Sequence, residues 1–191
     1  MAVVGDVCGK GAAAAAVTAL ARYTMRAAAM REDEPAAVLS ALNEAMIRQL
    51  EGGDQFCTVA CARLRPADRP GFELTVARGG HPAPLVLRAD CSIEALDPPG
   101  KALGVFPDPE LGDRRVRLEA GDAAVFYTDG VVEARGPDGS FFGEGRLLDL
   151  LSACAGLEAS TIAEKLRAVV VEYGEGNPRD DLAILVLRVP E

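Results

Sequence analysis

The period of the hydrophobic positions changes along the chain and predicts the order of the elements. Residues 2 to 5 are apolar and predict a strand, and the alanine-rich stretch from about Lys10 to Met30 favours a helix. The stretch "DEPAAVLSALNEAMIRQLEGG" predicts a second helix, capped by Asp33 or Glu34, with Pro35 in its first turn. The apolar face and the end of this helix are assigned to Val38, Leu39, Leu42, Met46, Leu50, Gly52 and Gly53.

From Gln55 onwards, hydrophobic residues recur at every second position. "FCTVACARL" and "FELTVAR" flank the turn-rich "RPADRPG" and predict an antiparallel hairpin, and "APLVLR", "CSIEAL", "RRVRL" and "DAAVFYTDG" predict further short strands. "EGRLLDLLSACA" and "TIAEKLRAVVVEYG" then predict two helices. In the second of them, Thr161 and Glu164 have the spacing of a capping box, and Gly174 supplies the end. The closing run "LAILVLRV" is suited to a strand covered on both sides.

The order of these elements predicts an α+β fold, with sheets packed between helical layers, and not an alternating βαβ chain. The 191 residues are enough to bury a sizeable core. We find no internal repeat, low-complexity linker or boundary between domains, so the sequence predicts a single domain over residues 1–191.

Composition narrows the classes of function. The formal net charge of −9 argues against nucleic acid as a partner. The five cysteines form no CxxC pair and are expected to be reduced apolar fillers of a cytoplasmic protein, without a zinc site. No membrane anchor is expected, because the uncharged stretch from Gly11 to Ala21 is well short of the roughly 20 residues that span a bilayer. No signal peptide is expected, because an apolar run and Asp6 follow Met1 without a basic leader.

Three aspartates share one sequence setting, the end of an apolar strand: Asp6 after "AVVG", Asp129 after "AVFYT", and Asp180 before "DLAILVLRV". Strand ends meet at one rim of a sheet, so these carboxylates can converge there, where they repel one another unless a cation lies between them. Mg²⁺ and Mn²⁺ prefer such oxygen ligands. Two such ions about 4 Å apart can polarise a phosphoryl group and activate water for attack on phosphorus.

Simpler interpretations exist for the same residues. Asp beside Gly is a common turn pair, and the spacing leaves open whether Asp181 caps a turn or supports the site. The glycine-rich turn is no P-loop, because Val4 and Gly11 stand where that motif needs Gly and Ser or Thr. Gly9, Gly11 and Ala14 match a loose dinucleotide-binding pattern, but a second helix and a hairpin follow in place of the βαβ unit.

The stretches "GDVCGKG", "GGHPAPLVLR", "GKALGV", "GDAAVFYTDGVVEAR", "FGEGRL" and "DDLAILVLRV" occur in this order over nearly the whole chain. Together they resemble the metal-dependent serine/threonine phosphatases of type 2C, most of all their bacterial branch, the sporulation stage II protein E and sigma-regulation phosphatases. The resemblance implies two packed antiparallel sheets flanked by helices and a centre of two Mn²⁺ or Mg²⁺ ions. It also implies hydrolysis of phosphoserine or phosphothreonine in a protein substrate, which in this branch is an anti-sigma-factor antagonist.

By this resemblance Asp6 bridges the two ions, Val7 offers its backbone carbonyl, and Asp129 and Asp180 complete the ligand set. The three aspartates are therefore the expected catalytic residues. Family members carry a further strand with a Gly-Gly-Asp motif before "GDVCGKG", so we expect a domain shortened at its N-terminus, with room for a sensor domain upstream. The alternative function is a catalytically silent, phosphatase-like domain that binds a partner protein.

Other polar residues have smaller expected roles. In the eukaryotic branch a histidine stands two residues after the bridging aspartate, where this chain has Cys8. His81 in "GGHPAP" is interpreted as part of a structural turn. Lys10 either draws a phosphate towards the site or is a solvated lysine at the start of a helix.

Overall fold

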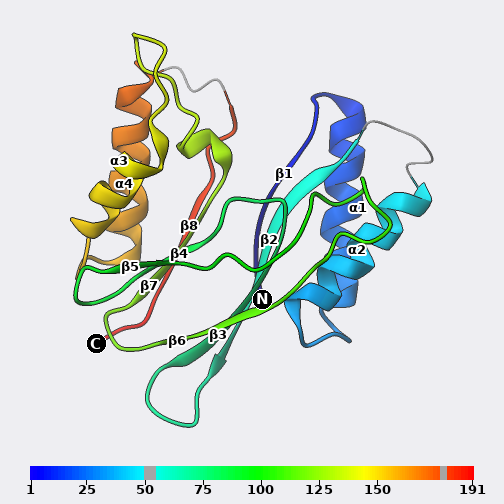
Figure 1. The fold of residues 1–191 in the computed structure, drawn as a ribbon, viewed down its shortest axis with the longest axis horizontal. Coiled ribbons are helices and arrows are strands. Elements are labelled where there is room, and N and C mark those ends of the chain that lie inside the picture. Colours follow the sequence, from blue (N-terminus) through cyan, green and yellow to red (C-terminus); the bar gives the residue numbers. More distant parts are fainter. Residues whose placement is uncertain (50–54, 177–179) are drawn as a thin grey trace. The chain divides into compact units, whose positions relative to one another are not determined.

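The computed structural model describes residues 1–49, 55–176 and 180–191, and its elements follow the predicted order (Figure 1). The strands are β1 (Ala2–Val7), β2 (Cys57–Pro66), β3 (Phe72–Gly79), β4 (Leu85–Leu87), β5 (Ile93–Ala95), β6 (Arg114–Leu118), β7 (Ala123–Tyr127) and β8 (Ile184–Arg188). The helices are α1 (Ala12–Ala28), α2 (Pro35–Gln49), the short 3₁₀ helix η1 (Asp129–Val131), α3 (Gly143–Ser152) and α4 (Ala159–Tyr173).

These elements form two antiparallel sheets flanked by helices, which confirms the predicted α+β class. The chain divides into two compact bodies, which we describe one at a time. The first comprises Met1–Arg65, Glu73–Ala83 and Asp97–Val116, and the second comprises Pro66–Phe72, Pro84–Leu96 and Arg117–Glu191. That the two sheets pack into one sandwich stays a prediction.

The sheet of the first body has the strand order β1-β2-β3-β6. β1 and β2 are antiparallel, with Val7 opposite Cys57 and Asp6 opposite Thr58. Side chains alternate between the faces of a strand. Val7 and Cys57 therefore belong to the face that packs on α1 and α2, and Asp6 and Thr58 belong to the opposite face. The buried residues of this core are Val17, Ala21, Met25, Val38, Leu39, Leu42, Met46, Cys57, Val59, Cys61, Ala77 and Leu103.

Both helices of the first body lie close to their predicted positions. α1 begins after Gly11, whose φ of 83° favours glycine, and it buries one residue in every three or four along its length. α2 begins at Pro35, where the missing N–H of proline leaves no helical hydrogen bond unmade. The predicted apolar face of α2 is buried at Val38, Leu39, Leu42 and Met46, whereas Leu50, Gly52 and Gly53 lie outside the described residues.

The sheet of the second body has the order β5-β4-β7-β8, and every residue of its central strand β7 is buried. α3 and α4 cover the face that carries Val125 and Tyr127 (Figure 1). Phe142 packs edge-on against Tyr173, with ring centroids 5.4 Å apart. The buried residues of this core are Leu85, Leu87, Ala123, Val125, Tyr127, Val131, Phe142, Leu147, Leu151, Cys154, Ile162, Leu166 and Val170.

The final strand departs from its prediction. β8 is an edge strand that pairs with β7, and its residues are only half-buried. The strands of this sheet that are buried along their whole length are the two inner ones, β4 and β7. An apolar run indicates that side chains are buried. The order of strands in a sheet depends on pairings between distant segments, and the sequence of one run gives no information on those pairings.

The predicted capping box at Thr161 and Glu164 is wrong. α4 begins at Ala159, two residues earlier, after Glu158 in an extended conformation, and no described side chain caps it. Thr161 therefore lies within the first turn instead of ahead of it. The predicted end of the helix at Gly174 is confirmed.

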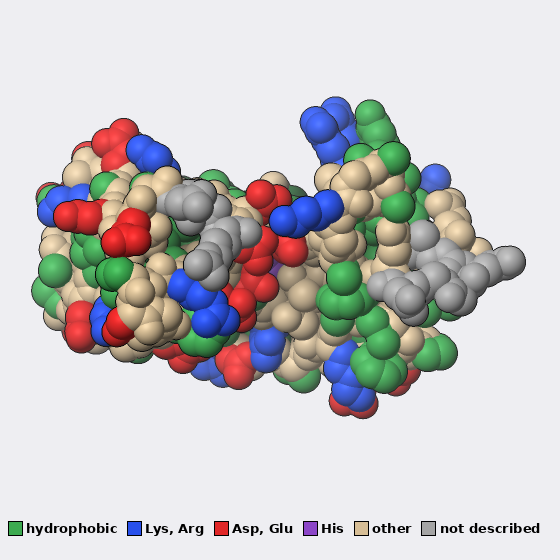
Figure 2. Space-filling model, turned by 90° about the horizontal axis from the view of Figure 1, so that it is seen from above, with side chains coloured by type: hydrophobic (Ala, Val, Ile, Leu, Met, Phe, Trp, Pro, Cys, Tyr) green, Lys and Arg blue, Asp and Glu red, His purple; other side chains and the backbone are tan. Residues whose placement is uncertain are grey.

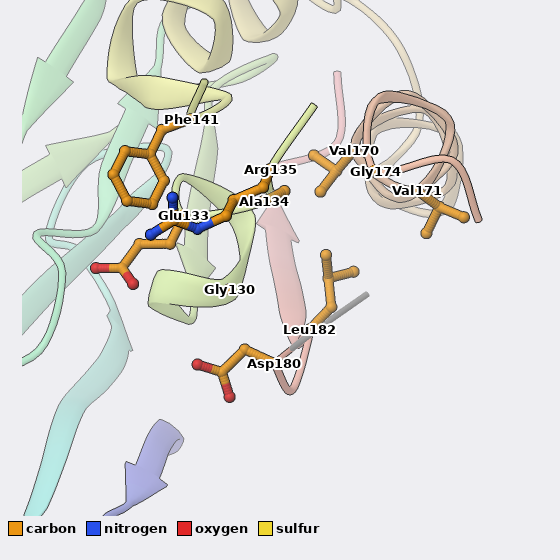
Figure 3. Close-up of a pocket in the computed structure, with 10 residues that line it drawn as sticks. All are labelled: Gly130, Glu133, Ala134, Arg135, Phe141, Val170, Val171, Gly174, Asp180 and Leu182. Atoms are coloured by element: carbon orange, nitrogen blue, oxygen red, sulfur yellow. The ribbon is translucent and has the colours of Figure 1, made fainter. Parts of the chain in front are cut away.

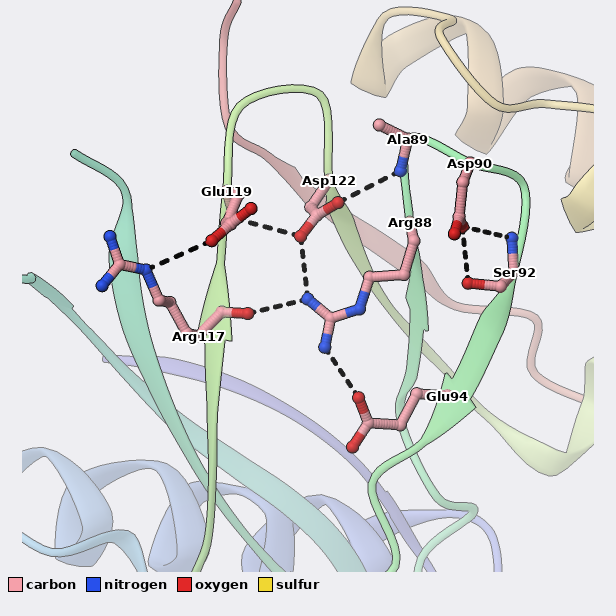
Figure 4. Close-up of polar contacts among 8 residues, drawn as sticks. All are labelled: Arg88, Ala89, Asp90, Ser92, Glu94, Arg117, Glu119 and Asp122. Carbon is pink, nitrogen blue, oxygen red and sulfur yellow. Dashed lines mark hydrogen bonds and ion pairs between the residues drawn. The ribbon is translucent and has the colours of Figure 1, made fainter. Parts of the chain in front are cut away.

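A buried carboxylate fastens the turns of the second body (Figure 4). Asp122, 4% exposed, pairs with the Arg88 guanidinium at 2.8 Å and accepts the backbone N–H groups of Ala89 and Glu119 at 3.1 and 3.0 Å. Arg88 also pairs with Glu94 at 2.7 Å. Because a buried charge is costly unless it is paired, this network fixes the end of β4 to the turn that precedes β7.

The cysteines are all free thiols, and Cys57, Cys61 and Cys154 are buried as predicted. Cys8 is half-buried and Cys91 is exposed, so these two are not core fillers. Burial raises the pKa of Cys57 and of Cys61 to about 12; the charge of Asp6 adds to the effect at Cys57. Both thiols therefore stay neutral near pH 7.

The distribution of charged and apolar residues over the described chain bears on its possible partners. On the face shown in Figure 2, Lys and Arg side chains stand apart from one another among Asp, Glu and apolar side chains. Among the described residues, no helix has both the length and the apolar character needed to span a bilayer.

Candidate active site

Two of the three predicted aspartates lie on segments that come together at one end of the second sheet. β7 and β8 are antiparallel, with Tyr127 opposite Ile184, so the end of β7 lies beside the start of β8. Asp129 begins η1, separated from β7 only by Thr128, and Asp180 lies in the segment that precedes β8. The pairing of these two strands therefore brings together aspartates that are 51 positions apart, as the position of each beside an apolar run predicts.

Thr128 holds the two segments together at this point. Its side chain is 2% exposed, and its Oγ1 donates to the carbonyl of Asp181 at 2.8 Å and accepts the N–H of Ala183 at 3.0 Å. Its own N–H donates to the carbonyl of Ala183 at 3.1 Å. Three hydrogen bonds thus fix the segment before β8 to the residue before Asp129.

Gly130 allows the same two segments to approach closely. A Cβ atom at this position would lie 2.6 Å from the carbonyl oxygen of Asp181 and 3.6 Å from the carbonyl carbon of Asp180. Such a contact is far inside van der Waals distance. The glycine of "TDG" is therefore required by the neighbouring backbone and not by a positive φ.

The two carboxylates have the character of ligands for a hard cation. One oxygen of Asp129 accepts the N–H of Gly130 at 3.0 Å, and one oxygen of Asp180 accepts the N–H of Asp181 at 2.9 Å. Within the described chain the second oxygen of each carboxylate accepts no hydrogen bond. These bonds orient both groups and leave oxygens that Mg²⁺ or Mn²⁺ can bind. Asp181 contributes its backbone carbonyl to the Thr128 contact.

Asp180 and Gly130, the neighbour of Asp129, line a cavity of about 130 Å³ (Figure 3). In Figure 3 the carboxylates of Asp180 and Glu133 point to the same side, where the Arg135 side chain and the Phe141 ring also lie. The residues that line the cavity are Gly130, Glu133, Ala134, Arg135, Phe141, Val170, Val171, Gly174, Asp180 and Leu182. Glu133, Arg135 and Phe141 were not predicted from the sequence; the signal available for them was their closeness to "TDG".

Asp6 and Val7 belong to the first body and are the last two residues of β1, which is two residues longer than predicted. Asp6 lies opposite Thr58, whose hydroxyl is 2.9 Å from Nδ1 of His81. His81 is 1% exposed, and its carbonyl accepts a hydrogen bond from Arg78, which fits its predicted structural role. That Asp6 joins the other two aspartates stays a prediction.

Two further observations bound the site. Among the described residues, no three side chains of His, Cys, Asp or Glu are arranged around one metal position. A metal centre built on Asp129 and Asp180 would therefore need further protein ligands. Lys10 is exposed beside Gly11, as expected of a solvated lysine at the start of a helix, and Cys8 is half-buried.

Comparison with known proteins identifies the family. A family model described as stage II sporulation protein E (SpoIIE) matches residues 1–190. The chain belongs to this family. The resemblance inferred from the motifs is therefore confirmed, including the sigma-regulation branch, because this SpoIIE-family chain is 27% identical over 186 residues to the phosphoserine phosphatase RsbU of Bacillus subtilis.

Other similarities are shorter or structural. Protein IcfG of Synechocystis is 31% identical over 80 residues, which are 42% of this chain. The SpoIIE-family chain spans only part of these curated relatives, 13% of IcfG and 54% of RsbU, and covers 97% of its own length in the RsbU match.

Solved structures confirm the fold of the SpoIIE-family chain. The SiaA-PP2C domain of Pseudomonas aeruginosa matches 97% of this chain and 74% of that chain, with a TM-score of 0.79 and 25% identity. The structure of the RsbU and RsbW domains of Rv1364c from Mycobacterium tuberculosis matches 99% of this chain and 53% of that chain, with a TM-score of 0.73 and 27% identity.

Proposed function

We propose that this chain is the catalytic domain of a metal-dependent phosphatase that hydrolyses phosphoserine on a protein. The observation that carries the proposal is the pairing of β7 with β8, which supports the convergence of Asp129 and Asp180 at one sheet end. The similarity to the phosphoserine phosphatase RsbU over nearly the whole chain supports the activity and the substrate class.

The residues that would hold two Mn²⁺ or Mg²⁺ ions are Asp6, Val7, Asp129 and Asp180. The fit rests on the chemistry of the second body, where Asp129 and Asp180 each keep a carboxylate oxygen without a hydrogen bond in the described chain. A divalent ion supplies Lewis-acid polarisation of the phosphoryl group and of the attacking water. The protein's part is to orient the carboxylates, through Gly130 N–H at Asp129 and Asp181 N–H at Asp180.

The predictions of the substrate protein and of the cellular location rest on the family resemblance and on the composition of the chain. The substrate expected from the family resemblance is a phosphorylated anti-sigma-factor antagonist, and the expected location is the cytoplasm. The net charge of −9 supports a protein substrate over nucleic acid, because a polyanion would be repelled by most of the surface.

The test is phosphate release from a phosphoserine peptide in the presence of Mn²⁺. Asp129→Asn and Asp180→Asn keep an oxygen that accepts the local N–H and remove the negative charge, so each should lower the rate about 100-fold or more while the circular dichroism spectrum stays the same. The matched control is Asp149→Asn, an exposed position on α3, which should keep the wild-type rate. Full activity of Asp129→Asn would refute the proposal.

The alternative of a catalytically silent interaction domain predicts a different pattern. Such a domain would bind a phosphoprotein without releasing phosphate, and neither aspartate variant would change that binding. Phosphate release that requires Mn²⁺ and is abolished by EDTA rejects this alternative.

A further inference from the structure

A short hairpin at residues 135–141 borders the cavity beside Asp180. Arg135 and Phe141 form an antiparallel bridge at its base. At its tip, the carboxylate of Asp138 accepts the N–H and the hydroxyl of Ser140 at 2.9 and 2.6 Å, and Gly136 N–H donates to the Ser140 carbonyl at 2.9 Å. The turn is therefore held by its own polar groups.

The hairpin is also fastened to the two helices of its body. The hydroxyl of Tyr173, at the end of α4, lies 2.5 Å from Ser140 Oγ and donates to the Phe141 carbonyl at 3.2 Å. Arg146 of α3 donates to the carbonyls of Phe141 and Phe142 at 3.1 and 2.9 Å. A surface element held in this way loses little conformational entropy when a ligand binds it.

Two side chains on this hairpin are open to a partner. The guanidinium of Arg135 stacks on the Phe141 ring, 4.3 Å from its centroid, and the ring is 45% exposed. Arg135 forms no ion pair with any described residue, although other arginines of the second body, such as Arg88 and Arg188, do. Both residues line the cavity that Asp180 also lines (Figure 3). An unpaired cation on an accessible ring is the composition of a recognition site.

We propose that Arg135 and Phe141 bind the polypeptide that flanks the phosphoserine in the substrate, with Arg135 selecting a carboxylate side chain and Phe141 packing against an apolar one. The inference rests on the proposed function, because it takes the neighbourhood of Asp129 and Asp180 as the place of hydrolysis. An acidic flank is favoured because Arg135 donates only to the carbonyl of Gly139, at 3.4 Å, and has no carboxylate partner among the described residues. Tyr173 is the positioning residue, since it fixes the backbone of the hairpin and lies outside the cavity lining.

The test compares two nonapeptides, each with a central phosphoserine and one leucine. The acidic peptide has Asp and Glu in its flanks, and the neutral peptide has Asn and Gln at the same positions. The wild type should prefer the acidic peptide about fivefold in kcat/KM, the size expected of one exposed charge contact, mostly through KM. Arg135→Gln should remove the preference and Arg135→Glu should reverse it. Tyr173→Phe should weaken it.

Arg167→Gln is the matched control, because Arg167 is an exposed arginine of α4 that does not line the cavity. It should keep the wild-type preference. A preference that Arg135→Glu leaves unchanged would overturn the inference. A loss of kcat/KM that is equal for both peptides would also overturn it, because this result means that Arg135 only supports the fold.

Binding separates this inference from the proposed function. Fluorescence anisotropy with the same peptides, labelled and measured in EDTA, reports the preference without turnover. Absence of phosphate release from both peptides by the wild type would reject the phosphatase, whereas the ratio of the two affinities would still test Arg135. If phosphate release is normal, and if the wild type and Arg135→Glu each bind the two peptides with equal affinity, the inference alone is rejected.

Discussion

The close approach of Gly130 to the segment before β8 leads to a quantitative prediction for Gly130→Ala. The added Cβ would lie 2.6 Å from the carbonyl oxygen of Asp181. Relief of this contact requires the two backbones to separate by about 0.5 Å or more, and overpacking of this kind costs about 1–3 kcal/mol. The displaced segment carries Asp180, and a shift of about 1 Å at a reacting centre can cost about 100-fold in rate.

The assay has two readouts, urea denaturation followed by circular dichroism and phosphate release with Mn²⁺. We expect Gly130→Ala to lower the free energy of unfolding by about 1–3 kcal/mol and the rate at least tenfold. The matched control is Gly145→Ala in α3, where an added Cβ meets nothing within 4 Å among the described residues. It should raise stability by about 0.5–1 kcal/mol. A Gly130→Ala protein with wild-type stability and rate would refute the argument.

The remaining predictions concern stability and are measured by urea denaturation. Thr128→Val removes two buried hydrogen bonds and should lower the free energy of unfolding by about 2 kcal/mol. Thr18→Val removes one hydrogen bond on an exposed face of α1 and should lower it by less than about 0.5 kcal/mol. Equal losses in the two variants would contradict the account. Asp122→Asn weakens a buried ion pair and should cost about 3 kcal/mol, and a loss below about 1 kcal/mol would count against its structural role. Burial raises the pKa of Cys57 and Cys61 from 9.0 to about 12, so their thiols ionise first in the unfolded chain. The stability they contribute should be constant below pH 9 and fall above it, by at most about 1.4 kcal/mol per pH unit for each thiol. The Cys57→Ala, Cys61→Ala double variant should have a shallower slope, and an unchanged slope would contradict this.

The sequence predicted elements well where the signal is local. α1 follows from the helix propensity of its alanines, the buried face of α2 follows from the helical period, and the hairpin of β2 and β3 follows from alternation around a turn. The proximity of the segments that carry Asp129 and Asp180 also has a local basis, because each aspartate stands at the end of an apolar run. The misplaced start of α4 shows the limit: the spacing of Thr161 and Glu164 is met by chance inside the first turn.

The features that the sequence did not predict depend on distant contacts. The edge position of β8 is set by its pairing with β7. The role of Thr128 depends on Asp181, 53 positions away, and Tyr173 holds Ser140 from 33 positions away. A hydroxyl in a short motif carries no sign of its partner. Such contacts therefore need coordinates.

The most direct test of the central claim, that Asp129 and Asp180 hold a divalent metal ion, is calorimetric titration of the protein with Mn²⁺. The wild type and Asp149→Asn should bind Mn²⁺ with the same affinity, whereas Asp129→Asn and Asp180→Asn should each bind at least about tenfold more weakly, because each loses a charged ligand. Equal Mn²⁺ affinity in all four proteins, or no binding by the wild type, would contradict the claim.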